Sequence, residues 1–84
     1  MENKEILKKK IIYRAFHRGS KEMDILLGNF VKTHIDDLNY DELKDLENIL
    51  VIEDDILQQW YFDQKNLNVI PKNKVSLLLK NFKL

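Results

Sequence analysis

The sequence has no cysteine, which excludes a disulfide, a thiolate metal site and a thiol nucleophile. It has only two glycines, Gly19 and Gly28, among 84 residues, and two separated glycines cannot form a phosphate-cradling loop. No run of 18 apolar residues is present, so we expect no insertion into a membrane. The composition, 44% hydrophobic and 33% charged, is typical of a soluble globular domain. At this length we expect a single domain over residues 1–84.

Charges of the two signs balance overall but are unevenly placed along the chain. The formal net charge is zero, with 14 Lys and Arg against 14 Asp and Glu. Residues 1–35 carry eight cations and four acids, residues 36–63 carry ten acids and one lysine, and residues 64–84 carry five lysines and no acid. We interpret this as oppositely charged helices lying beside one another, in preference to a functional dipole. The acidic middle argues against a dedicated nucleic-acid binder, which is normally basic overall.

The first five residues, Met1 to Glu5, include two acids and no apolar stretch. They resemble neither a secretory signal nor a typical mitochondrial presequence. The simplest expectation is a cytoplasmic protein of a bacterium.

Apolar residues recur with a helical period along most of the chain, and strand-like alternation is absent. The pattern predicts helices over about 3–17, from Ser20 to about 35, from Asn39 to 50 and from Asp54 to 61, with a fifth helix after Pro71. Short connections between short helices predict an all-α fold, a small five-helix bundle. The apolar stripes place these side chains in the core: Phe16, Leu27, Phe30, Leu46, Leu50, Trp60 and Leu78.

Capping residues mark the predicted helix starts. Ser20 is positioned to cap the second helix, and Asn39 with Glu42 three residues later forms a helix-start pair. Asp54 is predicted to cap the fourth helix. Gly28, inside the second helix, costs about 1 kcal/mol relative to alanine, which favours close helix packing at that point.

The polar residues do not assemble an enzyme. His17 and His34 are 17 residues apart without metal-ligand spacing, and we expect His34 to lie at a helix interface. Ser20 has no partner motif for a catalytic triad. The pairs Asp36-Asp37 and Asp54-Asp55 fall at predicted helix boundaries, where capping and solvation explain them better than acid–base catalysis.

One stretch, Arg18-Gly19-Ser20-Lys21-Glu22, concentrates residue types that are scarce elsewhere in the chain. Arg14 and Arg18 are the two arginines among 14 cationic residues, and Gly19 follows Arg18 directly. Arginine has a planar, bidentate fork that lysine lacks. Glycine permits a backbone conformation, or a close approach by another molecule, that a Cβ forbids. With Glu22 in the first turn of the next helix, the stretch predicts an exposed contact point where the first two helices meet.

Further residues extend this predicted contact point along the first helix. Lys10, Arg14 and Arg18 are spaced at i, i+4 and i+8 and form a basic line on one side of the helix. His17 either interacts with the last carbonyls of that helix, where the dipole is negative, or contacts a partner directly.

The sequence His17-Arg18-Gly19-Ser20-Lys21-Glu22-Met23-Asp24 resembles the RGxxE motif of the succinate dehydrogenase assembly factor family. That family includes the bacterial flavinylation factor SdhE and mitochondrial assembly factor 2 (Sdh5). The surroundings are also similar: Met23-Asp24-Ile25-Leu26 follows the motif, and Asp54-Asp55-Ile56-Leu57-Gln58-Gln59-Trp60 is similar to an acidic segment leading to a tryptophan. The resemblance spans about residues 5–65. Ile56 and His17 depart from the acid and the arginine that many members carry there.

The resemblance implies a five-helix bundle that binds the flavoprotein subunit of succinate dehydrogenase, or of fumarate reductase in some bacteria. It implies promotion of the covalent attachment of FAD to a histidine of that subunit, without the protein forming the bond itself. Arg18, Gly19 and Glu22, with His17 and Arg14 beside them, would then bind the partner. No tightly bound cofactor is expected, since the FAD belongs to the flavoprotein.

Two other functions remain open from the residues alone. A generic helical protein-interaction module of unknown partner would carry RGxxE by coincidence. A small nucleic-acid binder would use the basic stripe from Lys8 to Arg18, and its affinity would fall steeply with salt. Co-purification with a flavoprotein would favour the assembly factor.

Overall fold

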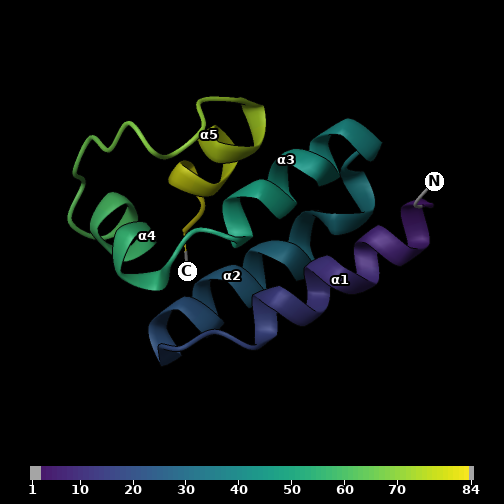
Figure 1. Cartoon of the computed structure of the whole chain (residues 1–84), viewed down its shortest axis with the longest axis horizontal. Helices are drawn as coiled ribbons and strands as arrows, with labels where there is room; N and C mark the ends of the chain where they lie inside the picture. The colour runs from purple at the N-terminus through teal and green to yellow at the C-terminus, as the bar shows by residue number, and fades with distance from the viewer. Residues whose placement is uncertain (1–2, 84) are drawn as a thin grey trace.

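The computed structural model describes residues 3–83 of the chain. Within this range there are five α-helices, one short 3-10 helix and no strand (Figure 1). The expected all-α five-helix bundle is confirmed. None of the helices in the described range is long and apolar enough to cross a membrane. The elements are α1 (Lys4–Phe16), α2 (Lys21–His34), the 3-10 helix η1 (Ile35–Asp37), α3 (Tyr40–Leu50), α4 (Asp54–Tyr61) and α5 (Lys74–Asn81).

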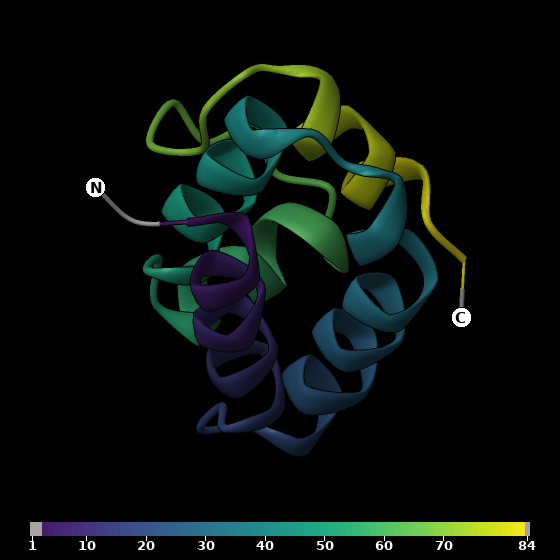
Figure 2. The same cartoon turned by 90° about the vertical axis from the view of Figure 1, so that its right-hand side faces the viewer.

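The helices α1 and α2 form an antiparallel hairpin, and α3 packs along α1 (Figures 1 and 2). The helix α5 then packs on α3. This arrangement brings the connection between α1 and α2 close to the connection between α3 and α4. One continuous apolar core lies between the helices. Its fully or almost fully buried members are Leu7, Ile11, Ala15, Met23, Leu26, Leu27, Phe30, Val31, Leu43, Leu46, Ile49, Leu50, Leu57, Val75 and Leu79.

The predicted core is confirmed at four of its seven positions, namely Leu27, Phe30, Leu46 and Leu50. Trp60 and Leu78 are half-buried and pack against the core from its edge. The prediction for Phe16 is wrong, because its side chain is 42% exposed.

Phe16 leaves the core because it lies at the end of α1, with its ring across the outer side of Gly28. A Cβ at Gly28 would lie 2.8 Å from Cε1 of that ring, closer than real contacts allow. The close packing predicted at Gly28 is therefore confirmed, and the side chain that approaches it is Phe16.

Capping fixes where α2 and α3 begin, as predicted. Ser20 Oγ accepts the backbone N–H of Met23 at 3.2 Å. Asn39 and Glu42 form a reciprocal capping box, with bonds of 2.8 and 2.9 Å. The Ser20 cap and the Asn39–Glu42 box supply partners for backbone N–H groups that the first turn of a helix leaves without one.

The oppositely charged segments do lie beside one another. Lys8 of the basic first segment pairs with Asp36 at 3.1 Å, and Lys74 of the basic last segment pairs with Glu42 at 3.0 Å. A third pair, between Arg18 and Asp54, joins the first segment to the acidic middle. The uneven charge distribution therefore serves packing between helices.

Candidate functional site

The RGxxE stretch begins in the four-residue connection from α1 to α2. Here α1 ends at Phe16, and His17 leaves the helical conformation. His17 Nδ1 is hydrogen bonded to the carbonyl oxygen of Tyr13 at 2.8 Å, and its ring stacks on the Tyr13 ring with centroids 4.1 Å apart. Of the two interpretations of His17, the interaction with a last-turn carbonyl is confirmed. Direct contact of His17 with a partner stays a prediction.

Arg18 is not the exposed residue that we expected. Its side chain is only 9% exposed and points into the bundle toward the end of α3. The guanidinium Nε donates to Asp54 Oδ1 at 2.7 Å, and Nη2 donates to the carbonyl oxygen of Ile52 at 2.8 Å. Nη1 donates to the carbonyl oxygen of Leu50. All three nitrogens of the fork are therefore occupied within the molecule.

The physical reason for this burial lies at the C-terminal end of α3. The last carbonyls of a helix have no intrahelical partner. Here the carbonyl of Leu50, the last residue of α3, and that of Ile52, in the connection that follows, accept hydrogen bonds from Arg18. A planar guanidinium satisfies both carbonyls and a carboxylate in one plane, which a lysine ammonium cannot do. This internal role explains why position 18 carries an arginine in a chain whose other cationic residues are mostly lysines.

Asp54 also binds the backbone of the connection between α1 and α2. Its Oδ2 accepts the backbone N–H of Gly19 at 2.8 Å and that of Ser20 at 3.0 Å. The backbone N–H of Arg18 donates to Asp24 Oδ1 at 2.7 Å. The prediction that Asp54 caps α4 is wrong, since it is the first residue of the helix and Glu53 precedes it as the cap, without a side-chain bond. Asp54 instead fixes the backbone of the RGxxE stretch.

Gly19 is exposed, and its backbone does not need glycine. No glycine in the described chain has a positive φ, and a Cβ at Gly19 would lie at an ordinary contact distance of 3.5 Å from Asp54 Oδ2. Of the two reasons given above for glycine, the conformational one is therefore wrong. The other reason, close approach by another molecule, is the one that the geometry leaves.

Glu22 lies in the first turn of α2, with its side chain in solvent. Within residues 3–83 no group hydrogen bonds to it or forms an ion pair with it, in contrast to Asp24 two residues later. A carboxylate at this place faces the N-terminal end of the α2 dipole. Glu22 is thus a fixed negative charge on an ordered turn, with no use inside the described part of the molecule.

The structure brings four of the five predicted site residues together. Arg14, His17, Arg18 and Gly19 line a groove of about 450 Å³ between the end of α1 and the α3–α4 connection. Glu22 lies outside this groove, on the adjoining first turn of α2. No group of three or more His, Asp or Glu side chains in residues 3–83 is arranged to hold a metal ion. The site therefore presents an exposed carboxylate, cationic side chains and the exposed backbone of a glycine to another molecule.

These features define a small helical bundle in which a largely buried ion pair anchors the turn that carries the RGxxE stretch. The chain belongs to the family described as "Flavinator of succinate dehydrogenase" (Sdh5), which matches it over residues 9–83.

Curated relatives agree with this assignment. The chain is 38% identical over 73 residues to "FAD assembly factor SdhE" of Acetobacter pasteurianus. The matched region covers 87% of this chain and 64% of the relative. It is 31% identical over 64 residues to "Succinate dehydrogenase assembly factor 2, mitochondrial" of Arabidopsis thaliana, covering 76% of this chain and 34% of that protein. A protein of the same name from Meyerozyma guilliermondii is 35% identical over 71 residues, covering 83% and 50%. The chain thus spans less than two thirds of each relative's length. No solved structure gives a significant match.

Proposed function

We propose that this protein is an assembly factor that binds the flavoprotein subunit of succinate dehydrogenase, or of fumarate reductase, and promotes its covalent flavinylation with FAD. The observation that carries the proposal is the exposed, unpaired Glu22 beside the bare backbone of Gly19, on a turn that Arg18 and Asp54 hold in place. Membership of the flavinator family and the names of the relatives support it. We further propose that it acts in the cytoplasm of a bacterium, and the relative from Acetobacter pasteurianus supports the bacterial part of this proposal.

The geometry suits a contribution by positioning. Three hydrogen bonds from the Arg18 side chain, and two from the backbone of Gly19 and Ser20 to Asp54, order the turn before a partner arrives. Little conformational entropy therefore remains to be lost on binding. The ionised Glu22 pairs with a cation of the flavoprotein, and Gly19 lets the partner's surface come close to the backbone. A flavoprotein held in one orientation aligns its histidine with the flavin.

In this proposal the chain supplies no catalytic group and holds no FAD tightly. Its contact residue Glu22 acts as a charge and not as a general base. The FAD is the flavoprotein's own cofactor, and covalent attachment takes place within that subunit.

The test is binding of the purified flavoprotein subunit to the wild-type chain, Glu22→Gln and Asp41→Asn. Asp41 is the matched control, because it is also an exposed acid in the first turn of a helix. We expect Glu22→Gln to weaken binding about tenfold, the effect of losing one well-placed charge pair, while Asp41→Asn binds like the wild type. Equal binding by all three chains would remove Glu22 from the interface.

A further inference from the structure

The outer face of α1 carries large apolar side chains that the described part of the chain leaves about half exposed. The inner face is buried through Leu7, Ile11 and Ala15. On the other side of the same helix Ile6 is 48% exposed and Tyr13 is 65% exposed. Ile12 and Phe16 are exposed by 42% each. Large apolar side chains outside the buried stripe of a helix present apolar surface that a partner can cover.

The same outer face is strongly basic. Lys9, Arg14 and His17 are exposed between and beside the apolar side chains. The one acid of α1, Glu5, is already near Lys8 at 3.9 Å. A surface with apolar centres and a cationic surround is complementary to an apolar surface edged with acids.

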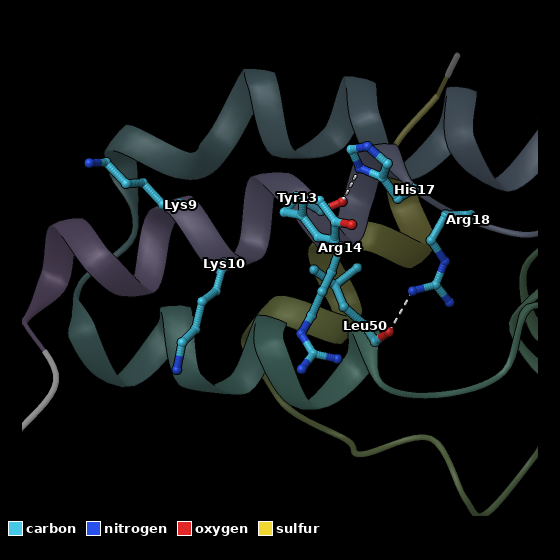
Figure 3. Close-up of a pocket in the computed structure, with 7 residues that line it drawn as sticks. All are labelled: Lys9, Lys10, Tyr13, Arg14, His17, Arg18 and Leu50. Atoms are coloured by element: carbon cyan, nitrogen blue, oxygen red, sulfur yellow. Dashed lines mark hydrogen bonds between the residues drawn. The ribbon is translucent and has the colours of Figure 1, made fainter.

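The shape of this face favours a protein segment over a lipid surface. Lys10 and Arg14 reach from α1 toward α3, and Leu50 forms the far wall (Figure 3). The stacked rings of Tyr13 and His17 form the near rim. Together they bound a groove of about 690 Å³, whereas a membrane presents a flat surface that would leave such a groove unfilled.

The groove also continues into the site already described. Arg14, His17 and Arg18 line both this groove and the neighbouring one at the α3–α4 connection, which reaches Gly19. A chain segment that lies along α1 therefore arrives at the backbone of Gly19 without leaving the surface.

We propose that the outer face of α1 is a second docking surface for the same flavoprotein subunit, one that receives an acidic segment bearing apolar side chains. This inference rests on the proposed function and extends it, because it adds a surface to the contact made by Gly19 and Glu22. Arg14 pairs with a carboxylate of the segment, a geometry suited to its fork. Tyr13, at the rim of the groove, supplies a large apolar contact.

The electrostatic part is tested with the charge reversal Lys9→Glu/Arg14→Glu, measured against the purified flavoprotein subunit at low and at physiological salt. The matched control is Lys72→Glu/Lys83→Glu, which makes the same change in net charge at two exposed lysines near α5. Figure 2 places the C-terminal segment on the opposite side of the molecule from α1. We expect the α1 reversal to weaken binding at least about tenfold at low salt and by less at higher salt, since salt screens exposed charges. The control should stay within about twofold of the wild type.

The apolar part is tested with Tyr13→Ser against Leu77→Ser. Leu77 lies on α5 and is 63% exposed, nearly the same as Tyr13. We expect Tyr13→Ser to weaken binding about fivefold and Leu77→Ser to leave it unchanged, because only Tyr13 loses buried contact area in the complex.

The outcomes separate this inference from the proposed function. A wild-type chain that does not bind the flavoprotein at all overturns both. A wild-type chain that binds, with the α1 variants binding equally well, overturns only the α1 surface. The same variants are also sedimented with anionic lipid vesicles. If they bind the flavoprotein like the wild type but no longer sediment with the vesicles, the α1 surface is overturned as a flavoprotein site, because the face would then bind a membrane. Unaltered far-UV circular dichroism and melting temperatures of the variants show that folding is intact in each arm.

Discussion

Arg18 and Asp54 lie 36 residues apart in the chain, yet the arginine Nε donates to the aspartate Oδ1 at 2.7 Å, with side chains only 9% and 18% exposed. This pair joins the α1–α2 connection to the start of α4. It follows that the two charged residues of the RGxxE motif have different roles. The arginine holds the turn from inside, and the glutamate faces solvent.

Replacing Arg18 should therefore lower stability markedly. Arg18→Ala leaves the Asp54 carboxylate and the Leu50 and Ile52 carbonyls without their partner, which costs about 3 kcal/mol for a largely buried pair. For a domain of this size the melting temperature should fall by roughly 12–24 °C. Thermal unfolding followed by circular dichroism measures the change.

Arg14→Ala is the matched control for this measurement, since Arg14 is the other arginine and its side chain is exposed. It should shift stability by no more than about 0.5 kcal/mol. Equal melting temperatures for the two variants would mean that the bonds of Arg18 do not hold the fold.

The energetic coupling between Arg18 and Asp54 can be measured directly with a double-mutant cycle. Arg18→Ala and Asp54→Ala each remove bonds of the same network, so their effects should not add. The double variant should be more stable than the sum of the single losses predicts, by about 1–3 kcal/mol. Urea unfolding of the four chains completes the cycle, and strict additivity would show that the residues act independently.

Gly19→Ala should leave folding almost unchanged. The φ of Gly19 is not positive, and the new Cβ meets only Asp54 Oδ2 at 3.5 Å, so the expected change is within about 0.5 kcal/mol. Flavoprotein binding should fall, because the methyl group stands where a partner approaches the backbone. A variant that is strongly destabilised would show instead that the glycine serves the fold.

Glu42 should contribute a pH-dependent term to stability. Its hydrogen bond from the Asn39 backbone and its pairing with Lys74 lower the pKa of Glu42 from the ordinary value of 4.5. The unfolded chain then binds more protons than the folded chain between the two pKa values, so stability rises with pH through that interval. The contribution is complete above about pH 4.5 and is lost as the pH falls through the folded pKa.

The comparison for Glu42 is the melting temperature of the wild type and Glu42→Gln from about pH 3 to pH 6. The wild type should be the more stable near pH 6, and the difference should shrink on acidification. Asp41→Asn, the neighbouring exposed acid, serves as the control. A difference that stays constant with pH would contradict the role given to Glu42.

Local signals in the sequence sufficed for the helices. The Ser20 cap and the Asn39–Glu42 box were readable because capping depends on residues three apart. The prediction for Phe16 is wrong because helical periodicity gives a direction around α1 but does not show what the ring packs against. Its ring lies over Gly28, at the edge of the core.

The sequence predicted where the site lies in the chain, but not the direction in which the Arg18 side chain points. Scarcity of arginine and glycine indicated the Arg18–Gly19 turn, and Glu22 was placed correctly in the first turn of α2. The inward direction of Arg18 could not be inferred, because its partners, Asp54 and the α3 carbonyls, lie more than 30 residues away in sequence. A pairing over such a distance is set by how α3 packs on α1 and leaves no local pattern.

The central claim is that the exposed charge of Glu22, on a turn anchored elsewhere, serves covalent flavinylation of a partner. The most direct measurement is in-gel flavin fluorescence of the denatured dehydrogenase flavoprotein subunit from cells with the wild-type gene, Glu22→Gln or a deletion. We expect strong fluorescence with the wild type, little with the deletion, and a clear reduction with Glu22→Gln at an unchanged melting temperature. Full covalent flavin in the deletion strain would contradict the assignment and leave a generic helical interaction module as the better interpretation.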